Sequence, residues 1–281
     1  MAFKTLVDTG TLARHIGDFT IVDCRYRLED EAWGRREYLA GHIPSAAYAH
    51  LAQDLAGTRT GRNGRHPLPE VDALKQTLGR LGIAEGVQVV AYDQDSGMYA
   101  SRLWWLLRWL GHESVAVLDG GFAKWVAEGR PVVAGDEPHA ARRFSGTPRP
   151  GVTMSADEVA YKSSRPDWRI VDARSPERFH GETEPIDRIA GRIPGAVNRF
   201  FKLNLDEDGT FRSPEELRAE LREVIGGIPG DHVVCYCGSG VTACHDLLAL
   251  EHAGLHGAKL YPGSWSEWSS DPSRPVERSE S

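Results

Sequence analysis

Short apolar runs rich in β-branched residues alternate along the chain with longer segments in which apolar residues recur every three or four positions. In the first half, residues 89–92 and 115–118 have the pattern of buried strands, whereas residues 100–110 and 122–128 have the spacing of helices. Strands that alternate with helices in this way are typical of a parallel sheet covered on both faces. The pattern therefore predicts the α/β fold class, with each parallel sheet flanked by helices.

The same pattern occurs twice, in the same order and at nearly the same spacing. The repeated segments are Ile-Val-Asp at 21–23 and 170–172, Gly-His-Ile-Pro at 41–44 and Gly-Arg-Ile-Pro at 191–194, Val-Val-Ala-Tyr-Asp at 89–93 and Val-Val-Cys-Tyr-Cys at 233–237, and Trp125 and Trp268. Self-similarity over half a chain is the signature of a duplicated fold. The sequence therefore predicts two tandem domains of one architecture.

The boundary between the two copies is marked by composition. Proline, glycine and charged residues accumulate between Ala134 and Gly151, which is typical of a linker. We predict a first domain at residues 1–135, a linker at 136–152 and a second domain at 153–281. The copies differ where the second has Cys237, because the first has Asp93 there. An acid cannot act as a sulfur nucleophile, so the first domain is predicted to be a non-catalytic copy.

The turn that follows the last strong strand of the second copy carries the candidate chemistry. It leads directly into a helical pattern, and its residues are Cys237, Gly238, Ser239, Gly240, Val241 and Thr242. The glycines permit a tight turn in which several backbone N–H groups point at one spot above a helix N-terminus. Amide dipoles there favour a thiolate over a thiol, which would make Cys237 a nucleophile. The alternative is a buried structural cysteine at a strand end.

Composition narrows the classes of function. The chain has 281 residues, of which 41% are hydrophobic and 26% charged, as in ordinary globular proteins. Its formal net charge of −7 argues against nucleic acid or an anionic membrane surface as a partner. No apolar run resembles a membrane span or a secretory signal, so we expect a cytoplasmic location. The four cysteines are too few for a disulfide scaffold, and no metal-ligand spacing or cofactor motif is present.

Together these motifs resemble the two-domain rhodanese sulfurtransferases, over nearly the whole chain. The residues that carry the resemblance are the two Ile-Pro segments, Asp119-Gly120-Gly121, Pro262-Gly263-Ser264-Trp265 and the stretch from Cys237 to Cys244. The resemblance implies two rhodanese-like domains. It also implies that Cys237 takes a sulfur atom from a small-molecule donor and holds it as a persulfide. The sulfur would then pass to cyanide or to a thiol acceptor such as thioredoxin or glutathione.

Within this family, the turn after the cysteine separates two classes of donor. Thiosulfate enzymes carry basic residues there, whereas 3-mercaptopyruvate enzymes carry Gly-Ser-Gly or Gly-Thr-Gly, which this chain resembles. Removal of sulfur from 3-mercaptopyruvate leaves an enolate that must be protonated, and Ser239 can serve as the proton donor. Thiosulfate instead leaves the dianion sulfite, which a cation would stabilise. The turn therefore favours 3-mercaptopyruvate as donor.

The resemblance implies further site residues. Arg178 and Arg188 match by position the two arginines that bind the donor, and a guanidinium suits a carboxylate. His42 resembles the family histidine that joins Ser239 in a proton relay, oriented by Asp30 or Glu31. The turn residues Gly238, Gly240, Val241 and Thr242 would line the donor site. For the arginines the alternative is a solvated surface position, and for His42 it is a structural role in its loop.

Three other functions remain open at the level of sequence. A thiosulfate sulfurtransferase would share the fold and the nucleophile. A non-catalytic rhodanese-like binding module would share the fold, but the intact cysteine turn argues against it. A cysteine phosphatase needs a turn one residue longer that ends in arginine, whereas Thr242 and Ala243 follow Val241 here. A 3-mercaptopyruvate sulfurtransferase is thus the function that the sequence predicts.

Overall fold

A computed structural model describes residues 2–279, and the chain divides into two compact units. Unit 1 comprises the chain up to Gly57, Leu68–Arg149 and Glu207–Phe211, and unit 2 comprises Thr58–Pro67, Pro150–Asp206 and Arg212 onward. The main division falls inside the predicted linker. Two short segments cross over: Thr58–Pro67 lies within the first half of the sequence but belongs to unit 2, and Glu207–Phe211 lies within the second half but belongs to unit 1. The predicted boundaries of 1–135 and 153–281 did not include these exchanges.

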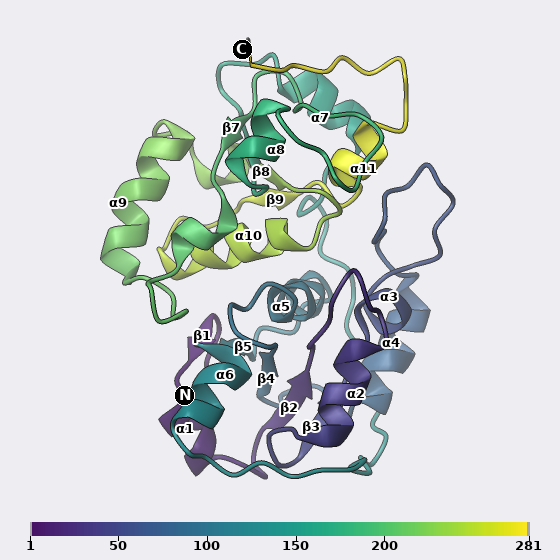
Figure 1. Cartoon of the computed structure of the whole chain (residues 1–281), viewed down its shortest axis with the longest axis vertical. Helices are drawn as coiled ribbons and strands as arrows, with labels where there is room; N and C mark the ends of the chain where they lie inside the picture. Colours follow the sequence, from purple (N-terminus) through teal and green to yellow (C-terminus); the bar gives the residue numbers. More distant parts are fainter. Residues whose placement is uncertain (1, 280–281) are drawn as a thin grey trace. The chain divides into compact units, whose positions relative to one another are not determined.

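Unit 1 is built on a five-stranded parallel sheet with the strand order β1-β5-β4-β2-β3 (Figure 1). The strands are β1 (Leu6–Val7), β2 (Thr20–Asp23), β3 (Ala46–Tyr48), β4 (Val89–Tyr92) and β5 (Val115–Leu118). The helices are α1 (Thr9–Arg14), α2 (Trp33–Ala40), α3 (Leu51–Asp54), α4 (Val71–Arg80), α5 (Ala100–Trp109) and α6 (Gly121–Ala127). Helices lie on both faces of the sheet, with α5 against β4 and β5.

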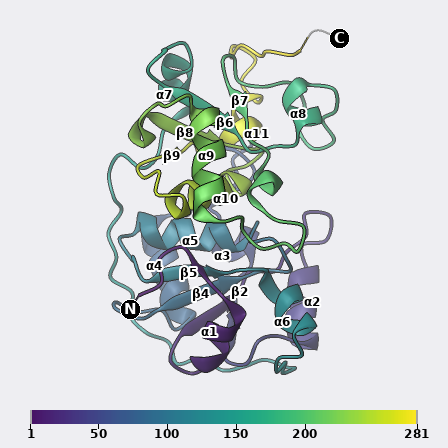
Figure 2. The same cartoon turned by 90° about the vertical axis from the view of Figure 1, so that its left-hand side faces the viewer.

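Unit 2 repeats this plan with four parallel strands in the order β7-β6-β8-β9. The strands are β6 (Arg169–Asp172), β7 (Val197–Asn198), β8 (Val233–Tyr236) and β9 (Lys259–Leu260). The helices are α7 (Ala156–Lys162), α8 (Pro176–His180), α9 (Pro214–Ile225), α10 (Thr242–His252), α11 (Ser264–Trp268) and the 3₁₀ turns η1 (Phe201–Asn204) and η2 (Gly230–His232). In Figure 2 the sheet of unit 2 lies between α7 and α10, and α9 packs against α10.

The two units have matching topologies, which confirms the predicted duplication and the α/β fold class. Read from the opposite edge, the order β9-β8-β6-β7 of unit 2 corresponds to β5-β4-β2-β3 of unit 1. The place of β1 is taken in unit 2 by a single parallel bridge between Thr153 and Leu260. The indole N–H groups correspond as well, since Trp125 donates to Pro131 O at 2.8 Å and Trp268 donates to Pro275 O at 2.9 Å.

The repeated Ile-Val-Asp segment ends in the same buried ion pair in both units. Asp23 accepts hydrogen bonds from the Arg25 guanidinium in unit 1, and Asp172 accepts them from Arg174 in unit 2. Each arginine also donates to the glycine carbonyl that precedes the Ile-Pro segment, Gly41 or Gly191, at 2.7 Å. A buried charge is tolerated when it is paired and hydrogen-bonded. The acid at the strand end is therefore a structural feature of the fold rather than a catalytic one.

Asp93 occupies the turn of unit 1 that corresponds to the cysteine turn. Its carboxylate accepts hydrogen bonds from the backbone N–H groups of Gly97 at 2.9 Å, Tyr99 at 2.7 Å and Ala100 at 3.0 Å. The amides at the start of α5 are thus directed at an anion, as expected for such a turn. Because the anion is the protein's own side chain, the nest of unit 1 is filled from within.

Replacement of Asp93 by alanine is expected to destabilise unit 1 without supplying any chemistry. Three buried N–H groups would lose their acceptor, at a cost on the order of 3 kcal/mol in the free energy of unfolding. Urea unfolding measures the loss, with the exposed neighbour variant Asp95→Ala as the matched control. Equal stability of the two variants would contradict the assignment of the carboxylate to the amide nest.

Candidate active site around Cys237

Cys237 lies directly after β8 and begins the turn that leads into α10. Its side chain is buried, and Sγ accepts a hydrogen bond from the Gly240 N–H at 3.1 Å. Gly240 has a φ of +75°, and a Cβ atom there would collide with the Pro262 carbonyl. A glycine is therefore required for the amide to turn back toward the sulfur. The sulfur thus already accepts one backbone hydrogen bond within its own turn.

The turn is held from below by the start of α11. The Cys237 N–H donates to Ser264 Oγ at 3.1 Å, and Ser264 Oγ in turn donates to the Tyr261 carbonyl at 2.9 Å. The carbonyls of Cys237 and Gly238 accept from the backbone N–H groups of α11 at 2.9 and 3.0 Å. The Pro262-Gly263-Ser264-Trp265 motif thus fixes the cysteine turn, a role that the sequence did not predict.

Ser239 sits in the same turn and has a histidine partner. Its Oγ lies 2.8 Å from Nδ1 of His66, and both side chains are buried. His66 belongs to the segment Thr58–Pro67, which is part of unit 2 although it follows α3 in the sequence. A hydroxyl hydrogen-bonded to an imidazole can give up a proton and recover it. The structure therefore places a hydroxyl–imidazole pair in the turn that begins at the cysteine.

The predicted partner of Ser239 was His42, a residue that the structure buries inside unit 1. His42 lies in unit 1 with no exposed surface, its Nδ1 is 2.8 Å from the Tyr38 carbonyl, and its ring stacks on Tyr38. Its backbone pairs with Val133. In the second copy Arg192 forms the corresponding bridge with Glu277. The Gly-His-Ile-Pro position is thus repeated as a backbone bridge in both copies, and the histidine that pairs with Ser239 in this structure is His66.

Of the two acids predicted to orient His42, Asp30 has another partner for its carboxylate, and Glu31 has one for its backbone carbonyl. Asp30 pairs with the Arg36 guanidinium, and the Glu31 carbonyl accepts from His50 at 3.0 Å. His66 itself carries Arg59 near its second ring nitrogen, with Arg59 Nη2 at 3.5 Å from Nε2. A usable signal for His66 existed in the sequence. His66 stands in a glycine- and arginine-rich segment between α3 and α4, at the position where the second half carries residues 207–211.

Arg178 is one of the two predicted donor-binding arginines, and it lies at the cysteine turn. A Cβ atom built on Gly238 would be 3.5 Å from both Nη atoms of Arg178. Its guanidinium grips Glu184 at two points, with Nε 3.1 Å from one oxygen and Nη2 2.7 Å from the other. It also donates to Asp187 at 3.2 Å. Arg178 is therefore held rigidly by two acids next to the nucleophile.

Glu184 stays ionised in this cluster. Burial works against its charge, but hydrogen bonds from Arg178 and from the backbone N–H groups of Ile186 and Asp187 outweigh burial and lower its pKa. Asp187 behaves differently, because burial raises its pKa although Arg65 and Arg178 both act to lower it. In this cluster the hydrogen bonds and nearby arginines outweigh the effect of burial on the pKa of Glu184, but they do not outweigh it for Asp187.

Arg188, the second predicted arginine, is exposed and, within the part of the chain described by the structure, makes no hydrogen bond or ion pair. Of the two predicted arginines, Arg178 is the one that the structure shows beside Gly238. Of the remaining predicted residues, Val241 is buried at the N-cap of α10, and Thr242 is the first helical residue. Both lie on the path from the nucleophile into the helix.

The other cysteines are buried away from solvent, and all four are free thiols. Burial raises the pKa of Cys235 well above its usual range, with Asp246 adding to the effect, so this residue stays protonated. Cys244 Sγ donates to the Gly240 carbonyl at 3.3 Å from within α10. Burial likewise raises the pKa of Cys24 well above its usual range. Cys237 is therefore the candidate nucleophile among the four.

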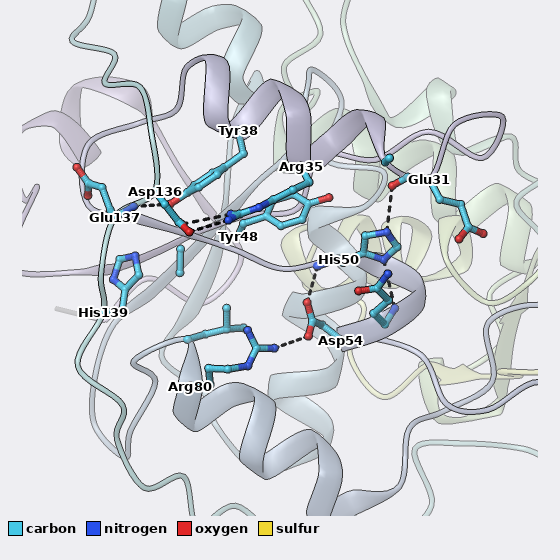
Figure 3. Close-up of a pocket in the computed structure, with 14 residues that line it drawn as sticks. Glu31, Arg35, Tyr38, Tyr48, His50, Asp54, Arg80, Asp136, Glu137 and His139 are labelled. Carbon is cyan, nitrogen blue, oxygen red and sulfur yellow. Dashed lines mark hydrogen bonds and ion pairs between the residues drawn. The ribbon is translucent and has the colours of Figure 1, made fainter.

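Unit 1 contains a pocket of 640 Å³ between α2, α3, α4 and residues 136–139 (Figure 3). Its charged groups are largely paired, since Arg35 binds Asp136 at 2.7 Å and Arg80 binds Asp54. None of the residues that line it is a cysteine. The pocket therefore offers no sulfur nucleophile.

Between residues 2 and 279, no group of three or more His, Cys, Asp or Glu side chains is placed to hold a metal ion. No helix in that range is long and apolar enough to cross a membrane.

Comparison with known proteins gives consistent matches over both units. A family model described as "Rhodanese-like domain" matches residues 8–128 and 155–271. A protein of Pseudomonas aeruginosa named as a probable 3-mercaptopyruvate sulfurtransferase is 45% identical over 92% of each chain. The thiosulfate sulfurtransferase of Bos taurus is 33% identical over 95% of this chain and 92% of its own. The structure of 3-mercaptopyruvate sulfurtransferase from Leishmania major superposes with a TM-score of 0.84, at 33% identity, over 95% of this chain and 74% of that one.

Proposed function

This chain belongs to the rhodanese family, and from that premise we propose that it is a sulfurtransferase with 3-mercaptopyruvate as its donor. The Cys237 thiolate attacks the donor sulfur, the carbon–sulfur bond breaks, and the electron pair moves into the enolate of pyruvate. The sulfur remains on Cys237 as a persulfide. A thiol acceptor such as thioredoxin or glutathione, or cyanide, then removes it and regenerates the thiolate.

The observation that carries this proposal is the hydrogen bond of 2.8 Å between Ser239 and His66 beside Cys237. The enolate needs a proton, and Ser239 Oγ can donate one while His66 returns it from behind. No lysine or arginine stands between Cys237 and Thr242. Arg178, next to Gly238, is placed to bind the donor carboxylate, and Arg188 is the second candidate for that role. Proton donation and carboxylate binding are both requirements of 3-mercaptopyruvate.

Thiosulfate remains the second candidate donor, and two observations favour it. A relative named thiosulfate sulfurtransferase matches almost the whole chain, and more than one guanidinium lies near Gly238.

The four free cysteines fit a reducing compartment such as the cytoplasm, where persulfide transfer to thiols is supported. A non-catalytic binding role is less well supported, because the cysteine turn and its proton-transfer pair are both intact.

Two measurements test the proposal. Incubation with 3-mercaptopyruvate followed by intact mass determination is expected to show the gain of one sulfur atom, which Cys237→Ser should not show. Side-by-side values of kcat/KM are expected to favour 3-mercaptopyruvate over thiosulfate. No sulfur gain with either donor would point to a binding module, and a higher kcat/KM for thiosulfate would overturn the choice of donor.

Substitution of Ser239 by lysine is expected to shift the donor preference toward thiosulfate. The change removes the hydroxyl that pairs with His66 and adds a positive charge where sulfite would depart. The ratio of the two kcat/KM values is the readout, and the exposed Ser164→Lys variant controls for the added charge. An unchanged ratio would contradict the role given to the Ser239 hydroxyl.

A further inference from the structure

Arg65 brings a positive charge to a cysteine turn that has none of its own. A Cβ atom at Gly238 would lie 2.8 Å from Nη2 of Arg65, so this nitrogen stands directly over the residue after Cys237. The other terminal nitrogen, Nη1, pairs with Asp187. The Nε–H is buried and has no hydrogen-bond partner among residues 2–279. The guanidinium therefore retains donors that its acid partner does not use.

Arg178 approaches Gly238 at the same time, with Nη1 and Nη2 both 3.5 Å from that Cβ position. The two arginines share Asp187, to which each donates a hydrogen bond. Their side chains are only 21% and 16% exposed, so their charges are little screened by solvent. Two guanidiniums that face one backbone position form a site for a small anion that arrives above Cys237.

We propose that Arg65 is a donor-binding residue that sets the specificity of this enzyme for small anionic sulfur donors. Together with Arg178 it binds the anionic group of the donor above Gly238, and it supplies from the segment Thr58–Pro67 the cation that the turn lacks. The inference rests on the sulfurtransferase function proposed above. It extends that function to a second donor class, thiosulfate, for which Arg65 matters most.

The chemistry with thiosulfate explains why Arg65 affects that donor more strongly. The Cys237 thiolate attacks the outer sulfur of thiosulfate, the sulfur–sulfur bond breaks, and its electron pair leaves with the SO₃ group as sulfite. The sulfur stays on Cys237 as an ionised persulfide. The leaving sulfite keeps two negative charges beside Gly238, and a guanidinium there stabilises them. With 3-mercaptopyruvate the electron pair enters an enolate that Ser239 protonates, so less charge needs a cation.

A purely structural role for Arg65 makes a different prediction. Arg65 and His66 are adjacent in sequence, so the ion pair between Arg65 and Asp187 could serve only to hold the segment that carries His66. Loss of that anchor would displace His66 from Ser239 and would impair 3-mercaptopyruvate at least as much as thiosulfate. It would not change the affinity for an unreactive anion to the same degree. Donor dependence and anion binding therefore separate the two roles.

The experiment compares Arg65→Ala and Arg65→Lys with Arg62→Ala, an exposed arginine of the same segment. We expect Arg65→Ala to lower kcat/KM for thiosulfate by about tenfold or more, and that for 3-mercaptopyruvate clearly less. Arg65→Lys should recover part of the loss, because lysine keeps the charge but not the planar pair of donors. Arg62→Ala should match the unmodified enzyme with both donors.

A second readout requires no turnover. Sulfate, an unreactive dianion, is expected to protect Cys237 from alkylation by iodoacetamide, and Arg65→Ala should raise the concentration for half protection by about tenfold. Equal losses for both donors, with sulfate protection unchanged, would overturn the inference in favour of the structural role. No change in any readout would overturn it as well. If the unmodified enzyme transfers no sulfur from either donor, the proposed function fails, while sulfate protection still measures anion binding by Arg65.

Discussion

Replacement of Cys237 by serine is expected to abolish sulfur transfer and to leave the stability of the protein nearly unchanged. A hydroxyl cannot form a persulfide, so no intermediate can accumulate with any donor. Serine nevertheless fits the same turn, because Gly240 N–H can donate to Oγ as it does to Sγ. Turnover with 3-mercaptopyruvate measures the first effect, and urea unfolding measures the second.

The remaining cysteines near the turn provide matched controls for this prediction. Cys244→Ser should keep much of the activity, because a hydroxyl can also donate to the Gly240 carbonyl from α10. Cys235→Ser should also keep much of the activity, since Cys235 is a protonated residue within β8 and takes no part in the proposed mechanism. A loss as complete as that of Cys237→Ser in either variant would indicate a dithiol mechanism and would contradict the single-nucleophile assignment.

The fold could be predicted because its information is local in the sequence. The strand pattern at 89–92 and the helix pattern at 100–110 agree with β4 and α5 almost residue for residue. Helical and strand periodicities record which side chains are buried within one element. Because the chain is duplicated, the same strand and helix patterns occur twice. The pattern of each copy therefore supports the element assignment of the other, without any knowledge of contacts.

The complete site could not be predicted, because its partners come from distant parts of the chain. His66 and Ser239 are separated by 173 positions, and no periodicity connects them. The Gly-His-Ile-Pro motif drew attention to His42 instead, although its counterpart in the second copy, Arg192, forms the same structural bridge. For function, the positions at which the two copies differ are more informative than those at which they agree. A residue that the duplication repeats supports the fold, and one without a counterpart is a candidate for chemistry.

Asp93 and Cys237 illustrate this difference at one position. Both side chains accept backbone N–H groups of the turn that precedes a helix. In unit 1 the carboxylate fills the nest by itself and needs no ligand. In unit 2 the sulfur accepts one amide and can bind a further atom. The exchange of an acid for a thiol thus turns a self-contained structural nest into the turn that the proposed mechanism uses.

Arg178→Ala is expected to lower kcat/KM for 3-mercaptopyruvate by about ten- to a hundredfold, which corresponds to one charge-assisted hydrogen bond of roughly 1.5–3 kcal/mol. Alkylation of Cys237 by a neutral reagent should change little, since the Gly240 N–H still faces the sulfur. This contrast separates a lost donor anchor from a disturbed turn. Arg178→Lys should restore only part of the activity, because lysine lacks the planar two-point grip.

Part of the loss in Arg178→Ala comes from the acid that the arginine leaves behind. Hydrogen bonds from Arg178 and nearby amides lower the pKa of Glu184 against the effect of burial. The variant therefore retains a buried carboxylate that has lost its two-point partner, keeps only Arg174 at 3.3 Å as a cation among residues 2–279, and repels an anionic donor. The double variant Arg178→Ala/Glu184→Gln should therefore be more active than Arg178→Ala alone. Arg188→Ala tests the second arginine, which is exposed in this structure. Normal turnover of 3-mercaptopyruvate in both alanine variants would show that neither arginine binds the donor carboxylate, and would contradict the role proposed for them.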